Sequence, residues 1–328
     1  MNTSQAWTPV RWAAHADVRL AFDRLTGNDQ GEPLLLIAGL GVSRLWWPQG
    51  LSEAFGARGF AVARYDQRDA GQSTRLPATA ARSPIAALLG RRGAAYTAEE
   101  MTDDAIAVLD ALGWESAHLF GVSLGGAIAQ RIAIRHPSRV RTLTTMSAVP
   151  GDAAGLETIR YVRLSTLVKL SRLKFPDTVE GDIESGVAVA RLISSPGYPF
   201  DERSSRETIT RIADAGVRDA RSQSRQIGAQ WHGPPISTIK APTLVLHGAG
   251  DPLIHPRAAR RIAVRVPGAR LRILPGVGHE LPEPVWDAIV DEVLGLQLLD
   301  RPTALGESLP VSHGRLGAAG EQDTGGEE

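Results

Sequence analysis

Ser123 has the sequence context of a nucleophilic serine. It is the centre of the G-x-S-x-G sequence of residues 121–125. The short apolar run 118–120 before it predicts a buried strand, and the small and apolar residues 127–134 after it predict a helix that packs on a sheet. A sharp turn between such a strand and such a helix would expose the Ser123 hydroxyl. The motif therefore predicts a nucleophile at the edge of a sheet.

Two backbone N–H groups are expected to stabilise negative charge next to this serine. The N–H of Leu124 lies at the start of the predicted helix, and helix N-termini carry a partial positive charge. The Gly-rich segment 38–41 follows the apolar run 34–37, which is typical of a central strand. Its spacing is not that of a G-x-G-x-x-G phosphate loop. We expect the Leu40 N–H to face the Leu124 N–H and to complete an oxyanion hole.

An acid and a base follow two later predicted strands. Asp251 comes after the strand at 243–247, and His279 comes after the strand at 271–274. With Ser123 they give the chain order Ser, acid, His, which is one of the orders of a catalytic triad. His279 would take the proton of the serine hydroxyl, while Asp251 would orient the imidazole and stabilise its charged form. Asp152, which follows another predicted strand, is the alternative acid.

Four other histidines have structural interpretations. His118 lies inside a predicted strand, and His136 ends a predicted helix before a proline. His247 ends a strand and His255 begins a helix. The sequence has no H-E-x-x-H motif and no cluster of carboxylates, so it predicts no metal site and no cofactor.

The remaining pattern predicts an α/β fold with a mostly parallel central sheet flanked by helices. A capping box at 97–100 begins one of the helices. The charged loop 65–74 contains Asp66, Arg68 and Asp69, which we expect to form a structural ion-pair network beside the site. Predicted strands occupy 18–22, 34–37, 60–64, 118–120, 140–146, 243–247 and 271–274, and predicted helices occupy 98–112, 256–266 and 285–299.

The alternation of strands and helices stops after residue 150 and resumes at 242. We therefore divide the chain into a first part of the core (1–150), a helical cap insertion (151–236), a second part of the core (237–300) and a disordered tail (301–328). Helical periods in the insertion fall at 156–173, 182–193, 205–215 and 218–229. Its aromatic residues either line a pocket over the site or form the small core of the insertion itself. Residues 77–92 are expected to be a variable surface loop.

Composition excludes several classes of protein. The 328 residues carry 36 basic and 36 acidic side chains, so the chain has no electrostatic case for binding nucleic acid. It contains no cysteine, which removes disulfides and thiolate chemistry. No apolar run is long enough to span a membrane, and no secretory signal is visible at the N-terminus. These features indicate a cytoplasmic protein, and the oligomeric state stays open.

Five segments together resemble the α/β-hydrolase superfamily. They are the segments 38–41, 65–73, 121–126, 248–252 and 276–279, and the resemblance covers nearly the whole chain except the tail and parts of the cap. Loop 39–48 and the Asp-x-Arg-Asp-x-Gly-x-Ser run at 66–73 are similar to those of bacterial esterases of the aclacinomycin methylesterase type. Many superfamily members have His-Gly where this chain has Ala38-Gly39, but the expected oxyanion donor is a backbone group. The superfamily also contains dehalogenases and epoxide hydrolases with an aspartate nucleophile, which Ser123 argues against.

The expected function is hydrolysis of a carboxylic ester of a hydrophobic small molecule through an acyl-serine intermediate. A thioesterase, a cofactor-free perhydrolase and an aminopeptidase could use the same triad. The aminopeptidase would need an acidic group in the cap to hold an amine, and Glu180, Asp182 and Glu184 are available. A non-catalytic ligand-binding protein of this fold is the alternative from another class. The substrate-binding residues stay unassigned.

Overall fold

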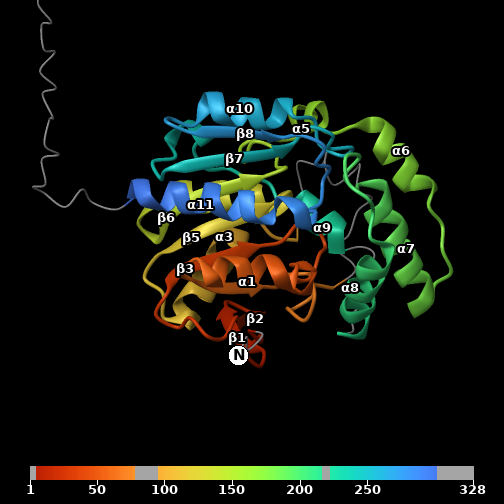
Figure 1. Ribbon diagram of the computed structural model, residues 1–328, viewed down its shortest axis with the longest axis horizontal. Coiled ribbons are helices and arrows are strands. Elements are labelled where there is room, and N and C mark those ends of the chain that lie inside the picture. The colour runs from red at the N-terminus through yellow and green to blue at the C-terminus, as the bar shows by residue number, and fades with distance from the viewer. Residues whose placement is uncertain (1–4, 78–94, 216–221, 301–328) are drawn as a thin grey trace, which may run out of the picture.

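The structure is a computed structural model that describes residues 5–77, 95–215 and 222–300. The described residues form one eight-stranded sheet in the order β1-β2-β4-β3-β5-β6-β7-β8 (Figure 1). The first two strands pair antiparallel and β2 pairs antiparallel with β4, whereas the other neighbours are parallel. The strands are β1 (Arg11–His15), β2 (Val18–Arg24), β3 (Glu32–Ile37), β4 (Phe60–Tyr65), β5 (Ala117–Val122), β6 (Val140–Met146), β7 (Thr243–Gly248) and β8 (Arg270–Leu274).

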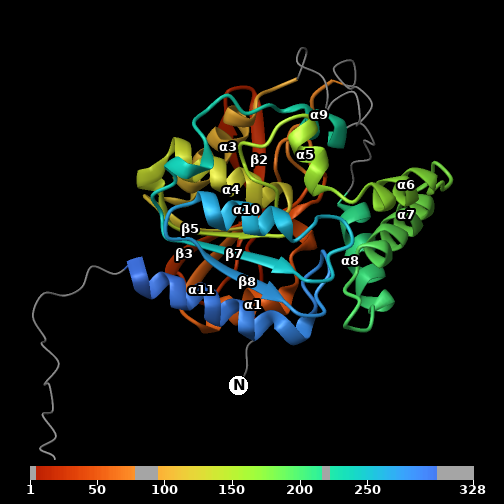
Figure 2. The ribbon, with the colours of Figure 1, turned by 90° about the horizontal axis from the view of Figure 1, so that it is seen from above.

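Helices cover both faces of the sheet, which confirms the predicted fold class. One face carries α3 (Ala98–Leu112), α4 (Leu124–Arg135) and α10 (Arg257–Arg265). The other carries α1 (Gln49–Ala57) and α11 (Trp286–Asp300), and Figure 2 shows the two layers on either side of the strands. The predicted capping box of α3 is present, because Thr97 and Glu100 each bond the backbone N–H of the other.

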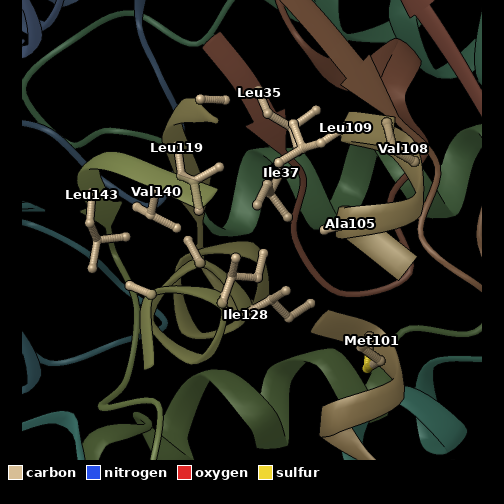
Figure 3. Packing of buried hydrophobic residues seen from close by; sticks show 14 of the residues in the cluster. Leu35, Ile37, Met101, Ala105, Val108, Leu109, Leu119, Ile128, Val140 and Leu143 are labelled. Carbon is tan, nitrogen blue, oxygen red and sulfur yellow. The ribbon is translucent and has the colours of Figure 1, made fainter. Parts of the chain in front are cut away.

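The core under α3 and α4 is built from aliphatic side chains of the central strands. Leu35 and Ile37 on β3 and Leu119 on β5 face the helices, and Val108 of α3 and Ile128 of α4 pack against them (Figure 3). All five are at most 1% exposed, so each contributes roughly 1.5–3 kcal/mol of burial free energy. This packing holds the ends of β3 and β5 in place.

The strand order brings the loops of interest to one edge of the sheet. The chain runs from β3 to β4 on one side and then to β5 on the other side. In open α/β sheets such a switch point forms the ligand-binding crevice at the carboxyl ends of the strands. Gly39, Ser123, Asp251 and His279 follow the ends of β3, β5, β7 and β8, which are parallel.

Five helices lie between β6 and β7, in the segment 151–236 that we call the helical insertion. They are α5 (Leu156–Tyr161), α6 (Leu164–Arg172), α7 (Val179–Leu192), α8 (Glu202–Asp214) and α9 (Ser222–Gly228), counted over 151–215 and 222–236. Figures 1 and 2 show α6, α7 and α8 beyond the end of the sheet to which the β7 arrow points. The single helix predicted over 156–173 is two helices, because Val162 forms a β-bridge with Ile254 between them. None of the helices within the described ranges is long and apolar enough to cross a membrane.

Two of the expectations fall on residues that are not described. Almost all of the predicted surface loop at 77–92 lies outside the described residues, and so does the tail at 301–328.

His118 makes the stability of this fold depend on pH. It is buried on β5, and its Nδ1 lies 2.8 Å from Thr142 Oγ1. Burial, and secondarily the charge of Arg141, lowers the pKa of His118 to about 4, whereas an unfolded histidine has a pKa of about 6.5. Between these values the unfolded chain binds a proton that the folded chain resists, so the free energy of unfolding should fall as pH falls. We expect this residue to remove about 2 kcal/mol between about pH 7.5 and pH 5.

Urea denaturation of wild type and His118→Gln at both pH values measures this term. Between the two pH values the free energy of unfolding of His118→Gln should fall by about 2 kcal/mol less than that of wild type. The exposed His232→Gln control should follow wild type. Equal losses in wild type and His118→Gln would contradict the assignment.

Candidate active site

Ser123 lies at the strained turn between β5 and α4. Its backbone has φ 58° and ψ −121°, in a region that non-glycine residues rarely adopt, and its N–H donates to the Met146 carbonyl at 2.9 Å. A Cβ on Gly121 would overlap the carbonyl of Gly125, and a Cβ on Gly125 would overlap the carbonyl of Ile37. Gly121 and Gly125 therefore allow a close backbone approach at this turn that a side chain would block.

The segment after β3 borders this serine. A Cβ built on Gly39 would lie 3.4 Å from Ser123 Cβ and 3.9 Å from its Oγ. Gln67 donates to the Ala38 carbonyl from the next loop, and Gly41 N–H donates to Gln226 Oε1 at 2.7 Å. The loop that contains Leu40 is thus held next to the turn that contains Leu124. The direction of these two N–H groups toward an oxyanion stays a prediction.

Asp251 and His279 form a buried hydrogen-bonded pair. His279 Nδ1 lies 2.8 Å from Asp251 Oδ2, and the aspartate is fully buried. The N–H groups of Leu253 and Ile254 both donate to Asp251 Oδ1 at 2.8 Å. The carboxylate therefore accepts the Nδ1–H of His279 and leaves Nε2 as the free basic nitrogen.

Electrostatics favours the ionised form of this carboxylate. Burial works to raise the pKa of Asp251, but attraction to His279, the hydrogen bond from it and the N–H of Ile254 outweigh burial and hold the pKa below its usual value. A second imidazole, His247, lies 3.5 Å from Asp251 Oδ2 and 3.1 Å from the Ile254 carbonyl oxygen. Burial, only partly opposed by Asp251, lowers the pKa of His247. A neutral His247 can thus donate from Nε2 beside the carboxylate.

The helical insertion contacts the loops that carry the acid and the base. Arg163 Nε donates to the Asp251 carbonyl at 2.8 Å, and Thr166 donates to the Pro252 carbonyl. On the other loop, His279 N–H donates to the Ile193 carbonyl at 3.0 Å, and Ser195 Oγ accepts the Gly278 N–H at 2.8 Å. The insertion therefore positions both loops.

The loop after β4 is an ion-pair network, as the sequence predicted. Asp66 accepts from Arg44 and Ser43, and Arg68 binds Asp104 at 2.6 and 2.8 Å. Asp69 forms two hydrogen bonds with Arg225 of α9, at 2.8 and 2.9 Å, and both side chains are fully buried. These charges support the loop that packs beside Gly41.

The alternative residues have other partners. Asp152 pairs with Arg265 and accepts the Ile236 N–H. His136 pairs with Asp103 at 2.8 Å, outside the strand-end loops. Of the insertion aromatics, Tyr161 packs on the core with Ile254, whereas Phe175 is exposed.

One contact of the predicted triad is not made. Ser123 Oγ has no hydrogen bond to any described residue, His279 included. Catalytic hydrogen bonds often form only when substrate is bound, so the alignment of Ser123 with His279 Nε2 remains part of the proposal below. Gln226, Arg163 and His247 were not identified as site residues from the sequence, and no local motif marks the first two.

The fold and the site define a class of protein. The chain belongs to the α/β-hydrolase fold family, whose profile matches residues 32–283. Rhodomycin D methylesterase DnrP of Streptomyces peucetius is 32% identical over 304 residues, which span 86% of this chain and 95% of that protein. The 2-hydroxymuconate semialdehyde hydrolase of Pseudomonas putida is 31% identical, over 77% of this chain and 83% of that protein. The solved carboxylesterase CesB of Bacillus subtilis shares the fold with a TM-score of 0.64 and 19% identity, covering 88% of this chain and 90% of that chain.

Gln226 joins the loops that contain Gly41 and Arg68, and a variant at this position tests whether that support matters for catalysis. Its side chain bridges the Gly41 N–H and the Arg68 carbonyl, at 2.7 and 2.9 Å. If the loop of Gly41 supplies the predicted oxyanion donor, we expect Gln226→Ala to lower kcat by about 10- to 100-fold with a smaller change in KM, because a misplaced donor weakens transition-state binding. The measurement is steady-state ester hydrolysis. Glu207→Ala, at an exposed position on α8, is the control, and an equal effect of both variants would refute a positioning role for Gln226.

Proposed function

We propose that this protein is a serine hydrolase that cleaves a carboxylic ester of a hydrophobic small molecule through an acyl-serine intermediate. The observation that carries the proposal is Ser123 at a turn with φ 58°, at the same sheet edge as the hydrogen-bonded Asp251–His279 pair. Each of these three residues follows the end of a parallel strand, which is where open α/β sheets bind ligands.

In the proposed mechanism His279 acts first as a base and then as an acid in each half-reaction. His279 Nε2 takes the Ser123 proton as Oγ attacks the ester carbonyl, and Asp251 stabilises the imidazolium. The tetrahedral oxyanion accepts hydrogen bonds from Leu40 and Leu124. His279 then protonates the leaving alcohol, which departs and leaves the acyl group on Ser123. Water, deprotonated by the same imidazole, attacks the acyl carbonyl, and the imidazolium returns the proton to Ser123 Oγ as the bond to the acyl group breaks and the acid leaves.

The relatives direct the choice of substrate. A protein that is 32% identical over 86% of this chain is named as a rhodomycin D methylesterase, so we propose methyl esters as the first substrate class. An aminopeptidase is less favoured on a specific observation. Glu180 and Glu184 bind Arg206 at 3.2 and 2.6 Å, so a substrate amine would have to displace an arginine from either carboxylate.

The test combines turnover with labelling. The purified chain is given rhodomycin D, with methanol release as the readout, and p-nitrophenyl esters of increasing acyl length. A serine-directed phosphonate is then mapped by mass spectrometry. Ester turnover with a label on Ser123 is the expected result. A chain that neither turns over any ester nor takes the label would refute the hydrolase and favour a ligand-binding protein. Turnover of thioesters or peptides alone would change the substrate class.

A further inference from the structure

Exposed apolar side chains gather on one part of the helical insertion. Of the nine large apolar residues that are exposed in the described ranges, six lie between Leu156 and Val179. Leu164, Leu167 and Val168 of α6 are 59%, 40% and 46% exposed, and their spacing of three and four residues puts them on one helix face. The six are Leu156, Leu164, Leu167, Val168, Phe175 and Val179.

The same segment carries a concentration of positive charge. Between Glu157 and Asp177 there are five basic residues and no acidic one, in a chain whose formal net charge is zero. Two of the three lysines of the chain, Lys169 and Lys174, are among them. The five are Arg160, Arg163, Lys169, Arg172 and Lys174.

These cations are not neutralised as their neighbours are. Arg160, Lys169, Arg172 and Lys174 are exposed, and none of the four pairs with a carboxylate within the described part of the chain. On α7 and α8, in contrast, Arg191 and Arg206 pair with glutamates. We call the exposed side chains of 156–175 the α5–α6 surface.

The inner side of α6 is already bound to the core. Thr166 donates to the Pro252 carbonyl, and the Arg163 N–H donates to the Leu253 carbonyl at 2.9 Å. Leu164, Leu167 and Val168 therefore lie on the outer side of α6, whose inner side makes hydrogen bonds to the loop after β7. Both ribbon views place α6 at the periphery of the molecule (Figures 1 and 2).

We propose that the α5–α6 surface binds peripherally to an anionic lipid membrane. Leucine and valine side chains on one helix face enter the boundary between headgroups and acyl chains, while flanking lysines and arginines reach the phosphates. Because Arg163 contacts the Asp251 carbonyl, the bound surface lies next to the acid loop. A hydrophobic ester dissolved in the bilayer would then lie close to the site.

Two observations favour a membrane over a protein partner. Lysine is depleted at protein–protein interfaces, yet two of the three lysines of the chain lie here. In a symmetric dimer the same patch meets itself, and this would bring four exposed cations against four. Anionic lipid matches both the charge and the apolar stripe.

Vesicle sedimentation tests the proposal without any turnover, so its result is independent of the proposed reaction. Vesicles of phosphatidylcholine alone are compared with vesicles that also contain about 30% phosphatidylglycerol, at low and high salt. We expect binding to the anionic vesicles to exceed binding to the neutral ones by at least about 10-fold and to weaken with salt. Wild type that stays in the supernatant with anionic vesicles would overturn the proposal.

Two variants separate the electrostatic contribution to vesicle binding from the apolar contribution. Lys169→Gln/Arg172→Gln/Lys174→Gln should lower partitioning onto anionic vesicles on the order of 100-fold. Leu164→Ser/Leu167→Ser/Val168→Ser should lower it at every salt concentration. Circular dichroism and hydrolysis of a water-soluble ester check that both variants are folded.

The matched control lies on another amphipathic helix. Arg257→Gln/Arg260→Gln/Val264→Ser removes two exposed cations and the most exposed apolar side chain, at 82%, from α10. It should bind vesicles as wild type does. An equal loss in this control would mean non-specific attraction and would overturn the proposal. So would light scattering that shows a wild-type dimer which the leucine variant converts to a monomer.

Discussion

Ser123→Ala is expected to lower kcat by about 10⁴- to 10⁶-fold while the protein stays folded. The large effect follows from the proposed mechanism, in which only the Ser123 hydroxyl forms the acyl intermediate and groups that act as a triad lose their effect together. The fold should be unaffected, because Ser123 Oγ makes no hydrogen bond to a described residue and alanine adds no atom to the turn. The measurement is single-turnover hydrolysis with thermal unfolding of the same sample.

A second serine variant makes the result specific. Ser204→Ala, at an exposed position on α8, should keep both turnover and phosphonate labelling. If Ser123→Ala retains more than about a tenth of wild-type kcat, the serine does not form a covalent intermediate and another nucleophile or an activated water must act.

The candidate site residues could be selected from the sequence because each follows a locally marked strand or turn, and their catalytic roles stay predictions. The Gly-x-Ser-x-Gly turn places its serine through clashes that only glycine avoids, and those clashes involve neighbours within a few residues and one adjacent strand. The strands β3 and β7 contain the apolar runs 34–37 and 244–246, and every residue of β7 is buried. Their short length and the glycines that follow them favour strands over helices.

The strand β1 and the helix α1 were not predicted, because the apolar residues of neither follow a clear strand or helix period. β1 is an edge strand with a single fully buried residue, Ala13, so its sequence has no period of two. α1 contains Gly50 and Gly56, which lower helix propensity, and its packing on the core overrides them. Its Gly50 would need Trp286 to move if it carried a Cβ, and this contact spans most of the chain.

The residues that support the site could not be predicted either, because their contacts also join segments far apart in the sequence. Gln226 and Gly41 are 185 residues apart in the chain, and a glutamine on a short polar helix resembles any solvent-exposed glutamine in sequence. Only the folded insertion brings this side chain to the Gly41 N–H. The sequence could therefore select the candidate reacting groups, whose roles stay predictions, while the groups that position them required the three-dimensional contacts.

The buried Asp69–Arg225 pair should have the largest effect on stability. Both side chains are fully buried and joined by two hydrogen bonds, and the Leu76 N–H also donates to Asp69. Arg225→Met leaves an uncompensated carboxylate in the interior, so we expect the free energy of unfolding to fall by about 3–5 kcal/mol. Denaturant unfolding measures it. Arg58→Met removes an arginine from a solvent-exposed pair with Asp291 and should lose about 1 kcal/mol or less.

The double variant Asp69→Asn/Arg225→Met distinguishes the charge from the loss of contact area. Asp69→Asn removes the buried negative charge that would otherwise lack a partner. The double variant should therefore be more stable than the sum of the two single losses predicts. Because α9 also carries Gln226, the same variants should lower kcat through the Gly41 loop. If the stability losses of the two single variants add up to that of the double variant, other groups compensate the charge of Asp69 when Arg225 is gone. The pair would then be one support of α9 among several.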